Sequence, residues 1–473
     1  MRLLTSLAAA ALSVVAPALT VTPVMAQDAP NDPALIAKGE AVARAGDCAA
    51  CHRAEQPGGK PFAGGYAIAS PMGAIIAPNI TPSRTAGIGE WSFADFDRAM
   101  RKGVTRNGTH LYPAMPFTEY QGISDADMKA LYAYFQHGVA PVDVKAPKTH
   151  LSFPFNIRQS MIAWDALFLD RTAYTPKPGL TVEQARGQYL VETLGHCGTC
   201  HTPRGMTMAS DTSQALAGGD IGGWHAPNIT SDPVSGIGGW SRSELVAYLK
   251  NGHVPGKGVA AGDMGEAVEN SLSGMDDVDL GAIAAYLKVS TPVRDAGEAK
   301  PSFSYTEPKA IKPSAYEPGD NHVQAQLADG TSTDGALLYN GACAACHGVN
   351  GKGTGDDFYA PLVGSSTTGA ANPANLIMTI LNGVDRHGAD GRSFMPAFAP
   401  QLNDAQVAAI ANHVLTRFGR PDVSVTEAMV ATARAGGAKP LIVTMVPWLM
   451  ALGAVIVLLL GGSVLRRRRA SLT

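Results

Sequence analysis

The chain contains six cysteines, and all six fall into three C-x-x-C pairs, each followed directly by histidine. This order is typical of covalent haem attachment, because two thiols on one short turn can form thioethers with the two haem vinyl groups while the adjacent histidine lies under the iron. The sequence therefore predicts three covalently bound haem c groups. The attachment residues are Cys48, Cys51, Cys197, Cys200, Cys343 and Cys346, and the proximal iron ligands are His52, His201 and His347.

Three other uses of paired cysteines fit this sequence less well than haem attachment does. Disulfides are common in exported proteins, but they do not explain a histidine after every pair. A structural zinc site usually takes two ligand pairs, which three separate motifs fit poorly. A thioredoxin-like C-x-x-C needs a strand before it and a helix after it, and the flanking residues do not supply them.

An internal repeat selects further candidates on the far side of the iron. The segment APNITPSRTAGIGEWS (77–92) returns as APNITSDPVSGIGGWS (226–241), and the same offset of 149 residues relates the first two haem motifs. That offset also takes Met115 to Met264, each 63 residues after its haem histidine. Methionine is a frequent distal ligand of c-type haem. In the third motif Met395 follows its histidine by 48 residues.

The three methionines differ in their local sequence. Met115 and Met395 are each followed by proline, as expected of a loop that holds a thioether in place, whereas Met264 is not. Met264 is therefore the least secure of the three predicted ligands. Four histidines stay open as rivals, with a minority chance for His225 and His253 at the second haem: His110, His225, His253 and His387.

The spacing of apolar residues predicts a mainly α fold of three tandem cytochrome-c-like domains. After each methionine a capping pattern precedes a helix whose apolar residues recur at i, i+3, i+4 and i+7. The patterns start at Ser124, Ser273 and Asn403, and the buried faces are expected at Met128, Leu131, Tyr132 and Phe135; Leu280, Ile283, Ala284 and Leu287; and Val407, Ile410, Ala411 and Val414. A short helix is also expected before each haem motif.

Both ends of the chain predict export and membrane anchoring. Residues 1–26 resemble a secretory signal with a small-residue cleavage site after Ala26. Residues 441–465 carry no charge and are followed by four arginines, which predicts one C-terminal transmembrane helix with residues 466–473 in the cytoplasm. The haem domains would then lie on the periplasmic side of the cytoplasmic membrane.

The remaining segments connect the domains. Residues 291–330 are rich in proline, lysine and glutamate and predict an extended linker. The connecting segment 141–180 contains FPFNIRQSMIAWDALFL (153–169), which is too apolar for a free linker; it is expected to pack between the first two domains, with a docking surface as the less favoured alternative. The predicted domains are 27–140, 181–290 and 331–420. A net charge of −3 gives no indication of nucleic-acid binding.

These motifs resemble the three-haem cytochrome c subunit of membrane-bound periplasmic dehydrogenases, best known from acetic acid bacteria. The resemblance rests on the three haem motifs, HCGTCHTPRG at the second of them, LYPAMPF before a closing helix, and the repeated APNIT segment. It implies a partner dehydrogenase subunit holding pyrroloquinoline quinone, flavin or a molybdenum cofactor, a possible small additional subunit, and ubiquinone in the cytoplasmic membrane as electron acceptor. It also implies Met115, Met264 and Met395 opposite the three histidines.

The sequence thus predicts an electron-transfer subunit that is not catalytic by itself. It contains no dinucleotide-binding glycine fingerprint and no nucleophile–base constellation. Two alternatives share the same haems: a membrane-tethered cytochrome that delivers electrons to a terminal oxidase, and, less favoured, a multihaem peroxidase with an open iron position at the second haem.

Overall fold

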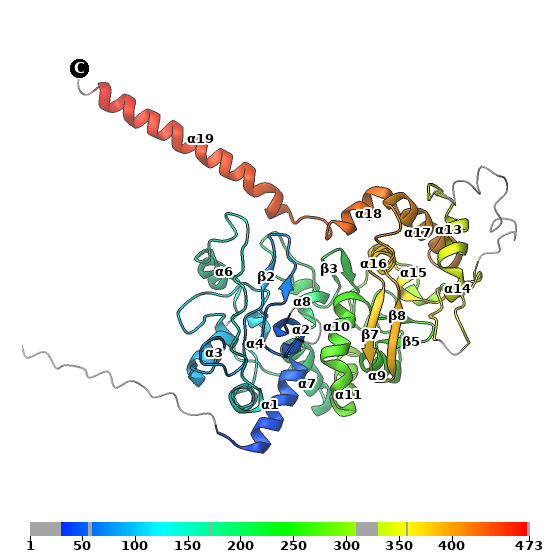
Figure 1. The fold of residues 1–473 in the computed structure, drawn as a ribbon, viewed down its shortest axis with the longest axis horizontal. Helices are drawn as coiled ribbons and strands as arrows, with labels where there is room; N and C mark the ends of the chain where they lie inside the picture. Colours follow the sequence, from blue (N-terminus) through cyan, green and yellow to red (C-terminus); the bar gives the residue numbers. More distant parts are fainter. Residues whose placement is uncertain (1–29, 55–58, 171, 309–329, 356–357, 471–473) are drawn as a thin grey trace, which may run out of the picture.

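The computed structural model describes residues 30–54, 59–170, 172–308, 330–355 and 358–470, and within them the chain is mainly helical (Figure 1). The predicted signal peptide, residues 1–26, lies outside the described residues. The strands of the described part are short and pair as four two-stranded antiparallel sheets: β1 with β2, β3 with β4, β5 with β6, and β7 with β8. The helices and the loops between them therefore build the interior.

The first group of elements surrounds the first haem motif. It begins with a helix that leads into the motif and ends with a helix that packs back across it. Its elements are α1 (Pro33–Ala45), α2 (Cys48–His52), β1 (Ala67–Ile68), β2 (Ile75–Ile76), α3 (Phe93–Lys102), α4 (Phe117–Tyr120), α5 (Asp125–Ala133) and the π-helical turn η1 (Tyr134–Gly138).

The second group repeats this plan with additions. Its elements are α7 (Val182–Tyr189), η2 (Leu190–Leu194), α8 (Gly198–His201), η3 (Thr212–Gln214), β3 (Gly219–Ile221), β4 (Trp224–Ala226), α9 (Arg242–Asn251), β5 (His253–Val254), β6 (Gly258–Val259), α10 (Gly262–Asn270), η4 (Leu272–Gly274) and α11 (Asp277–Leu287). Between the two groups lies α6 (Ser160–Phe168).

The third group holds the last haem motif. Its elements are η5 (Ser302–Ser304), α13 (Gly335–Ala342), α14 (Ala344–His347), α15 (Ser366–Gly369), α16 (Ala374–Asn382), β7 (Val384–Gly388), β8 (Gly391–Met395), α17 (Asp404–Phe418) and α18 (Glu427–Arg434). A long helix, α19 (Leu441–Ala470), projects away from the rest of the molecule (Figure 1).

A glycine lies at the crossing of the leading and closing helices in every group. A Cβ atom at Gly39 of α1 would lie 2.0 Å from the Ala130 carbonyl oxygen of α5, and one at Gly187 of α7 would lie 1.9 Å from that of Ala282 in α11. In the third group, a Cβ at Gly335 of α13 would lie 2.3 Å from the Ala409 oxygen of α17. The two backbones touch at each crossing, so only glycine fits there.

Two of the three predicted caps are confirmed. The Ser124 side chain accepts a hydrogen bond from the Asp127 N–H at the start of α5, and Asn403 forms a full capping box with Gln406 at the start of α17. The prediction at Ser273 is wrong, because Asp276 caps α11 while the Ser273 hydroxyl turns back to the Glu269 carbonyl. Asp276 has a carboxylate at the right distance from the Asp279 N–H, which makes it the stronger cap.

The predicted apolar helix faces are confirmed as buried. All twelve residues of the three predicted faces, on α5 and η1, α11 and α17, are buried. One continuous hydrophobic core joins the first and second groups, while α16, α17 and α18 enclose another in the third. The first two haem motifs are therefore held by one core.

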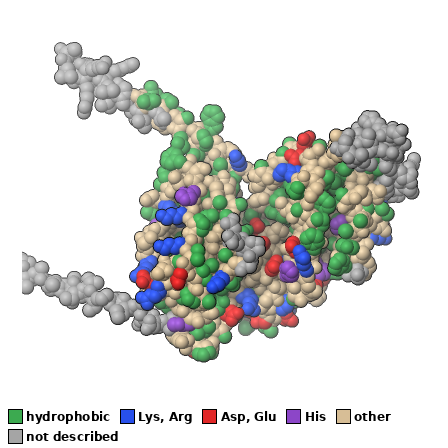
Figure 2. Space-filling view, viewed as in Figure 1, with side chains coloured by type: hydrophobic (Ala, Val, Ile, Leu, Met, Phe, Trp, Pro, Cys, Tyr) green, Lys and Arg blue, Asp and Glu red, His purple; other side chains and the backbone are tan. Residues whose placement is uncertain are grey.

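The apolar segment 153–169 packs between the first two groups, as predicted. Trp164 of α6 lies edge-on to Phe117 and donates its indole N–H to the Thr207 carbonyl of the second group, and Arg158 donates to the His110 carbonyl of the first. Part of the segment remains exposed: Phe153, Ile162 and Leu167 are each more than half exposed. Figure 2 shows apolar side chains gathered at the upper left, where α6 and the first turns of α19 lie.

The prediction of a transmembrane helix over 441–465 is wrong. The segment forms α19, but no helix in the part of the chain that the structure describes is both long enough and apolar enough to cross a membrane. The helix contains Pro447 and continues through the four arginines to Ala470, so charged residues belong to the same helix as the apolar run. The expected anchoring in the cytoplasmic membrane, with residues 466–473 in the cytoplasm, depended on that span and is therefore not supported.

Candidate haem sites

Each haem motif begins where a leading helix ends. In the first motif α1 stops at Ala45, and the next helical turn, α2, carries Cys48, Cys51 and His52 on five consecutive residues. The residue before the first cysteine has a left-handed backbone in the first two motifs, with φ of 50° at Asp47 and 37° at His196. This reversal separates the helix that leads into each motif from the motif's own helical turn.

The three motif histidines share one hydrogen-bond arrangement. His52 Nδ1 lies 2.8 Å from the Pro78 carbonyl oxygen, His201 Nδ1 lies 2.7 Å from that of Pro227, and His347 Nδ1 lies 2.8 Å from that of Ala360. Because a carbonyl oxygen can only accept, Nδ1 must carry the proton, which leaves the lone pair on Nε2 free for a metal. Burial lowers the pKa of all three imidazoles, so they are held neutral, as an iron ligand must be.

A single cavity of about 2960 Å³ brings the first two predicted sites together. Its lining includes both cysteines and the histidine of each motif, together with the two methionines that the repeat selected, Met115 and Met264. Aromatic and aliphatic side chains such as Trp91, Phe96 and Trp240 form much of the remaining wall. For each of two haem groups, this apolar cavity offers two thiols for attachment, a neutral imidazole and a thioether.

The third site stands apart from this cavity. Cys343, Cys346, His347 and Met395 are not among its lining residues. Met395 is the last residue of β8, where it pairs with Val384 of β7. The structure thus brings the first eight predicted haem residues to one cavity and places the last four elsewhere.

A loop was expected around each methionine, and only one of the three lies in one. Met115 lies in the loop between the isolated bridge at His110 and α4. Met264 lies in the first turn of α10, and Met395 lies in a hairpin strand. A helix and a strand can each fix a side chain without a following proline, so the missing proline after Met264 does not argue against it.

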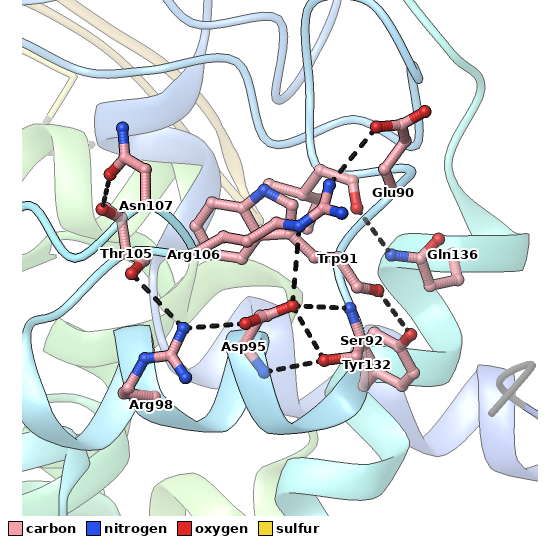
Figure 3. A network of polar contacts seen from close by, with 11 residues as sticks. Glu90, Trp91, Ser92, Asp95, Arg98, Thr105, Arg106, Asn107, Tyr132 and Gln136 are labelled. Atoms are coloured by element: carbon pink, nitrogen blue, oxygen red, sulfur yellow. Dashed lines mark hydrogen bonds and ion pairs between the residues drawn. The ribbon is translucent and has the colours of Figure 1, made fainter. Parts of the chain in front are cut away.

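The repeated GIG-x-WS segments anchor the helices that line the cavity. Figure 3 shows the first of them: Ser92 and Asp95 form the capping box of α3, Tyr132 of the closing helix donates to the Trp91 carbonyl at 2.7 Å, and Arg106 lies within ion-pair distance of Asp95. In the second group, Ser241 and Glu244 form the same box on α9, and Lys288 Nζ donates to the Trp240 carbonyl. The repeat therefore places one cavity-lining tryptophan beside each of the first two sites.

The four rival histidines are each engaged by a carboxylate. His110 pairs with Asp165 at 2.6 Å, His225 with Asp220 at 2.7 Å, His253 with Asp390 at 3.6 Å and His387 with Glu269 at 3.2 Å. His225 is also two residues from Pro227, which accepts the His201 hydrogen bond, so it lies on the proximal side of the second site. In three of the four the carboxylate faces Nδ1 and leaves Nε2 free, so these contacts do not decide between methionine and histidine as the distal ligand.

The six cysteines, all within the described residues, are free. Burial raises the pKa of Cys48 to about 12 and that of Cys197 to about 11, which keeps both thiols protonated. In the part of the chain that the structure describes, no three His, Cys, Asp or Glu side chains are grouped so as to hold a metal ion directly. The geometry thus agrees with haem attachment and offers no zinc-type ligand cluster.

The first two motifs touch one another through residues that the sequence analysis did not single out. The imidazole of His196, directly before Cys197, lies close to the carbonyl of Gly46, two residues before Cys48. The Tyr120 hydroxyl donates to the same carbonyl at 2.6 Å, and its ring lies 5.5 Å from that of His196. His196 corresponds to Asp47, the neighbour of Gly46, in the repeat with an offset of 149 residues. This equivalence was the only sign in the sequence of a contact between the two positions.

Helical modules built around C-x-x-C-H turns with buried neutral histidines define a multi-module c-type cytochrome. Models of known families agree: residues 36–138 match cytochrome c, and residues 330–414 match the family described as cytochrome C oxidase, cbb3-type, subunit III. The second haem motif lies outside both matched ranges. Covalently bound haem c follows from these matches.

Relatives that match most of the chain identify the family more closely. The fructose dehydrogenase cytochrome subunit of Gluconobacter japonicus is 44% identical over 409 residues, which cover 85% of this chain and 83% of that protein. The gluconate 2-dehydrogenase cytochrome c subunit of Pantoea cypripedii is 40% identical, covering 87% and 91%. The cytochrome c subunit of the alcohol dehydrogenase (quinone) of Gluconacetobacter polyoxogenes is 38% identical, covering 88% and 87%. The chain belongs to the family of cytochrome c subunits of quinone-dependent dehydrogenases, and the resemblance noted from its motifs is confirmed.

Proposed function

We propose that this chain relays electrons from a dehydrogenase catalytic subunit to ubiquinone through three haem c groups. Haem c, when bound, supplies a reversible one-electron iron couple whose potential depends on its ligands and burial. The attachment residues would be the three cysteine pairs. The proximal ligands would be His52, His201 and His347, and the distal ligands Met115, Met264 and Met395.

The contact between the first two motifs carries this proposal. The Tyr120 hydroxyl donates to the Gly46 carbonyl while its ring packs against His196, and both motifs line one cavity, so two haems attached there would lie next to each other. An electron relay requires redox centres at close and fixed distances, whereas a site that converts a substrate does not require them. The partner would be a dehydrogenase catalytic subunit, because relatives of this chain carry dehydrogenase names. A pyrroloquinoline quinone, flavin or molybdenum cofactor in that subunit is what the resemblance of the motifs implies.

The modules proposed for the relay are residues 27–140, 181–290 and 331–420. Each contains one haem motif, one candidate methionine and one glycine at a helix crossing. Each proximal histidine is fixed by a backbone carbonyl from its own module. The chain's own residues would thus fix the ligand tautomer and exclude water, while ligand identity and burial set the potential of each iron.

Haem counting and reconstitution test the proposal. The purified chain should contain three covalent haems, and all three should be reduced when the co-purified dehydrogenase subunit turns over its substrate. The same complex should then reduce a water-soluble ubiquinone. A chain with only two covalent haems, or a complex that reduces the haems and leaves ubiquinone oxidised, would contradict the proposal.

A second acceptor is favoured by one observation. The match of residues 330–414 carries the name of an oxidase subunit, so delivery to a terminal oxidase is the alternative. Co-purification separates the two, because an oxidase partner supports the alternative and a dehydrogenase partner with quinone reduction supports the relay. Peroxide turnover by the isolated chain would instead indicate an open iron position.

A further inference from the structure

Arg386 of β7 is a buried arginine without an ion-pair partner. Only 2% of the residue is exposed, its Nε has no hydrogen-bond partner, and among the described residues no carboxylate forms an ion pair with it. Two nearby carboxylates are already engaged, Asp390 with His253 and Glu269 with His387. Burial of an unpaired charge is costly, so it persists where the charged group has a specific task.

The guanidinium of Arg386 joins the third module to the second. Its Nη1 donates to the Ala260 carbonyl at 2.7 Å, and its Nη2 donates to the Ser393 hydroxyl of β8 at 2.8 Å. It lies so close to Gly252 that a Cβ there would be 2.4 Å from Nε. Gly252 in turn accepts a hydrogen bond from the Ala260 N–H at 2.7 Å, so Arg386 is fixed against a closed backbone turn.

That turn leads directly into α10, which begins at Gly262 and carries Met264 in its first turn. The helix also forms an ion pair with each neighbouring module: Glu266 pairs with Arg53 at 3.0 Å, and Glu269 pairs with His387 at 3.2 Å. Figure 2 shows acidic, basic and histidine side chains gathered in the region of α10 and the β7–β8 hairpin. Of these contacts, the one from Arg386 is buried and the closest to the start of the helix.

We propose that Arg386 is the positioning residue for Met264, so that the third module holds the distal ligand of the second iron in place. This inference rests on the proposed role of Met264 as a ligand. The first turn of α10 holds Met264, and the buried guanidinium of Arg386 fixes the backbone turn that leads into that helix. The same hairpin ends at Met395, which pairs with Val384, so one element supports the methionines of two sites.

The full-length holoprotein, with its covalent haems, provides the test. Arg386→Leu should retain all covalent haem and lose about one third of the far-red charge-transfer band of methionine-ligated ferric haem, since one iron of three is affected. The ferrous variant should bind about one additional equivalent of carbon monoxide per chain. Arg386→Lys should show a smaller change of the same kind, because one ammonium group replaces the two-pronged guanidinium.

Arg392→Gln is the matched control, because Arg392 lies on β8 of the same hairpin and forms an exposed ion pair with Asp385. It should leave the band and carbon monoxide binding unchanged. Met264→Ala should lose the same third of the band, and adding Arg386→Leu to it should cause no further loss. An unchanged band in both Arg386 variants, with a reduced band in Met264→Ala, would overturn this inference alone. An unchanged band in Met264→Ala would overturn the proposed ligand itself.

Discussion

Gly187→Ala is expected to force apart the two helices that close the second module. A Cβ at this position of α7 would lie 1.9 Å from the Ala282 carbonyl oxygen of α11, and real Cβ contacts shorter than 3.0 Å are essentially never seen. The helices must therefore separate by roughly 1 Å or more, and overpacking of this kind costs about 1–3 kcal/mol. Alanine recovers about 0.5–1 kcal/mol of helix propensity, which leaves a net loss of up to about 2.5 kcal/mol.

This loss should be visible in thermal unfolding. Because the first two groups share one core, they should unfold together, and for a unit of that size a change of 1 kcal/mol shifts Tm by roughly 2–4 °C, so their transition should fall by up to about 10 °C in differential scanning calorimetry. The third group has a core of its own, so the transition is assigned by the haem signals that disappear with it.

Gly281→Ala in the partner helix is the control for the same substitution. A Cβ at Gly281 meets only the ends of two side chains, Arg242 at 3.7 Å and Glu183 at 3.9 Å. It should be neutral or stabilising by up to about 1 kcal/mol through helix propensity. If the two variants show the same Tm, the helices are not in backbone contact at Gly187, and the requirement for glycine at the helix crossings is wrong.

Two further changes test the first haem site. Replacing Cys48 and Cys51 together by alanine removes both thioether bonds, so the covalent haem count should fall by one, from three to two, in a haemochrome assay; an unchanged count would refute the attachment site. Asp47→Asn tests a buried carboxyl: burial and the nearby Glu266 raise the pKa of Asp47 to about 8, against the partial opposing effect of Arg53. The folded chain therefore keeps a proton that the unfolded chain releases near pH 4, and this group's contribution to stability is lost as pH rises from about 4 to 8. The asparagine variant should show a flatter dependence in unfolding measured across that range, and an equally steep one would contradict the argument.

The chemistry of this chain was readable in its sequence because covalent attachment needs a fixed local order of residues. Cys48, Cys51 and His52 are neighbours on one helical turn, so no tertiary information was needed to recognise them. The apolar stripe of α17 was predicted for the same reason, since helical periodicity is local. The start of α11 was missed because two capping patterns, at Ser273 and Asp276, compete within one turn and only the surrounding packing decides between them.

The packing of segment 153–169 between the first two modules was expected from its apolar composition, but direct contacts between modules could not be predicted, because they join residues far apart in the chain. The sequence by itself determined the haem motifs, the repeat, the family and the buried helix faces, all of which depend on spacing within a short segment. Only the tertiary structure decided that His196 lies beside Gly46 and that Arg386 is buried beside the helix of Met264. The physical reason is that backbone contact and burial of a charge depend on which surfaces face each other, and no local pattern specifies that.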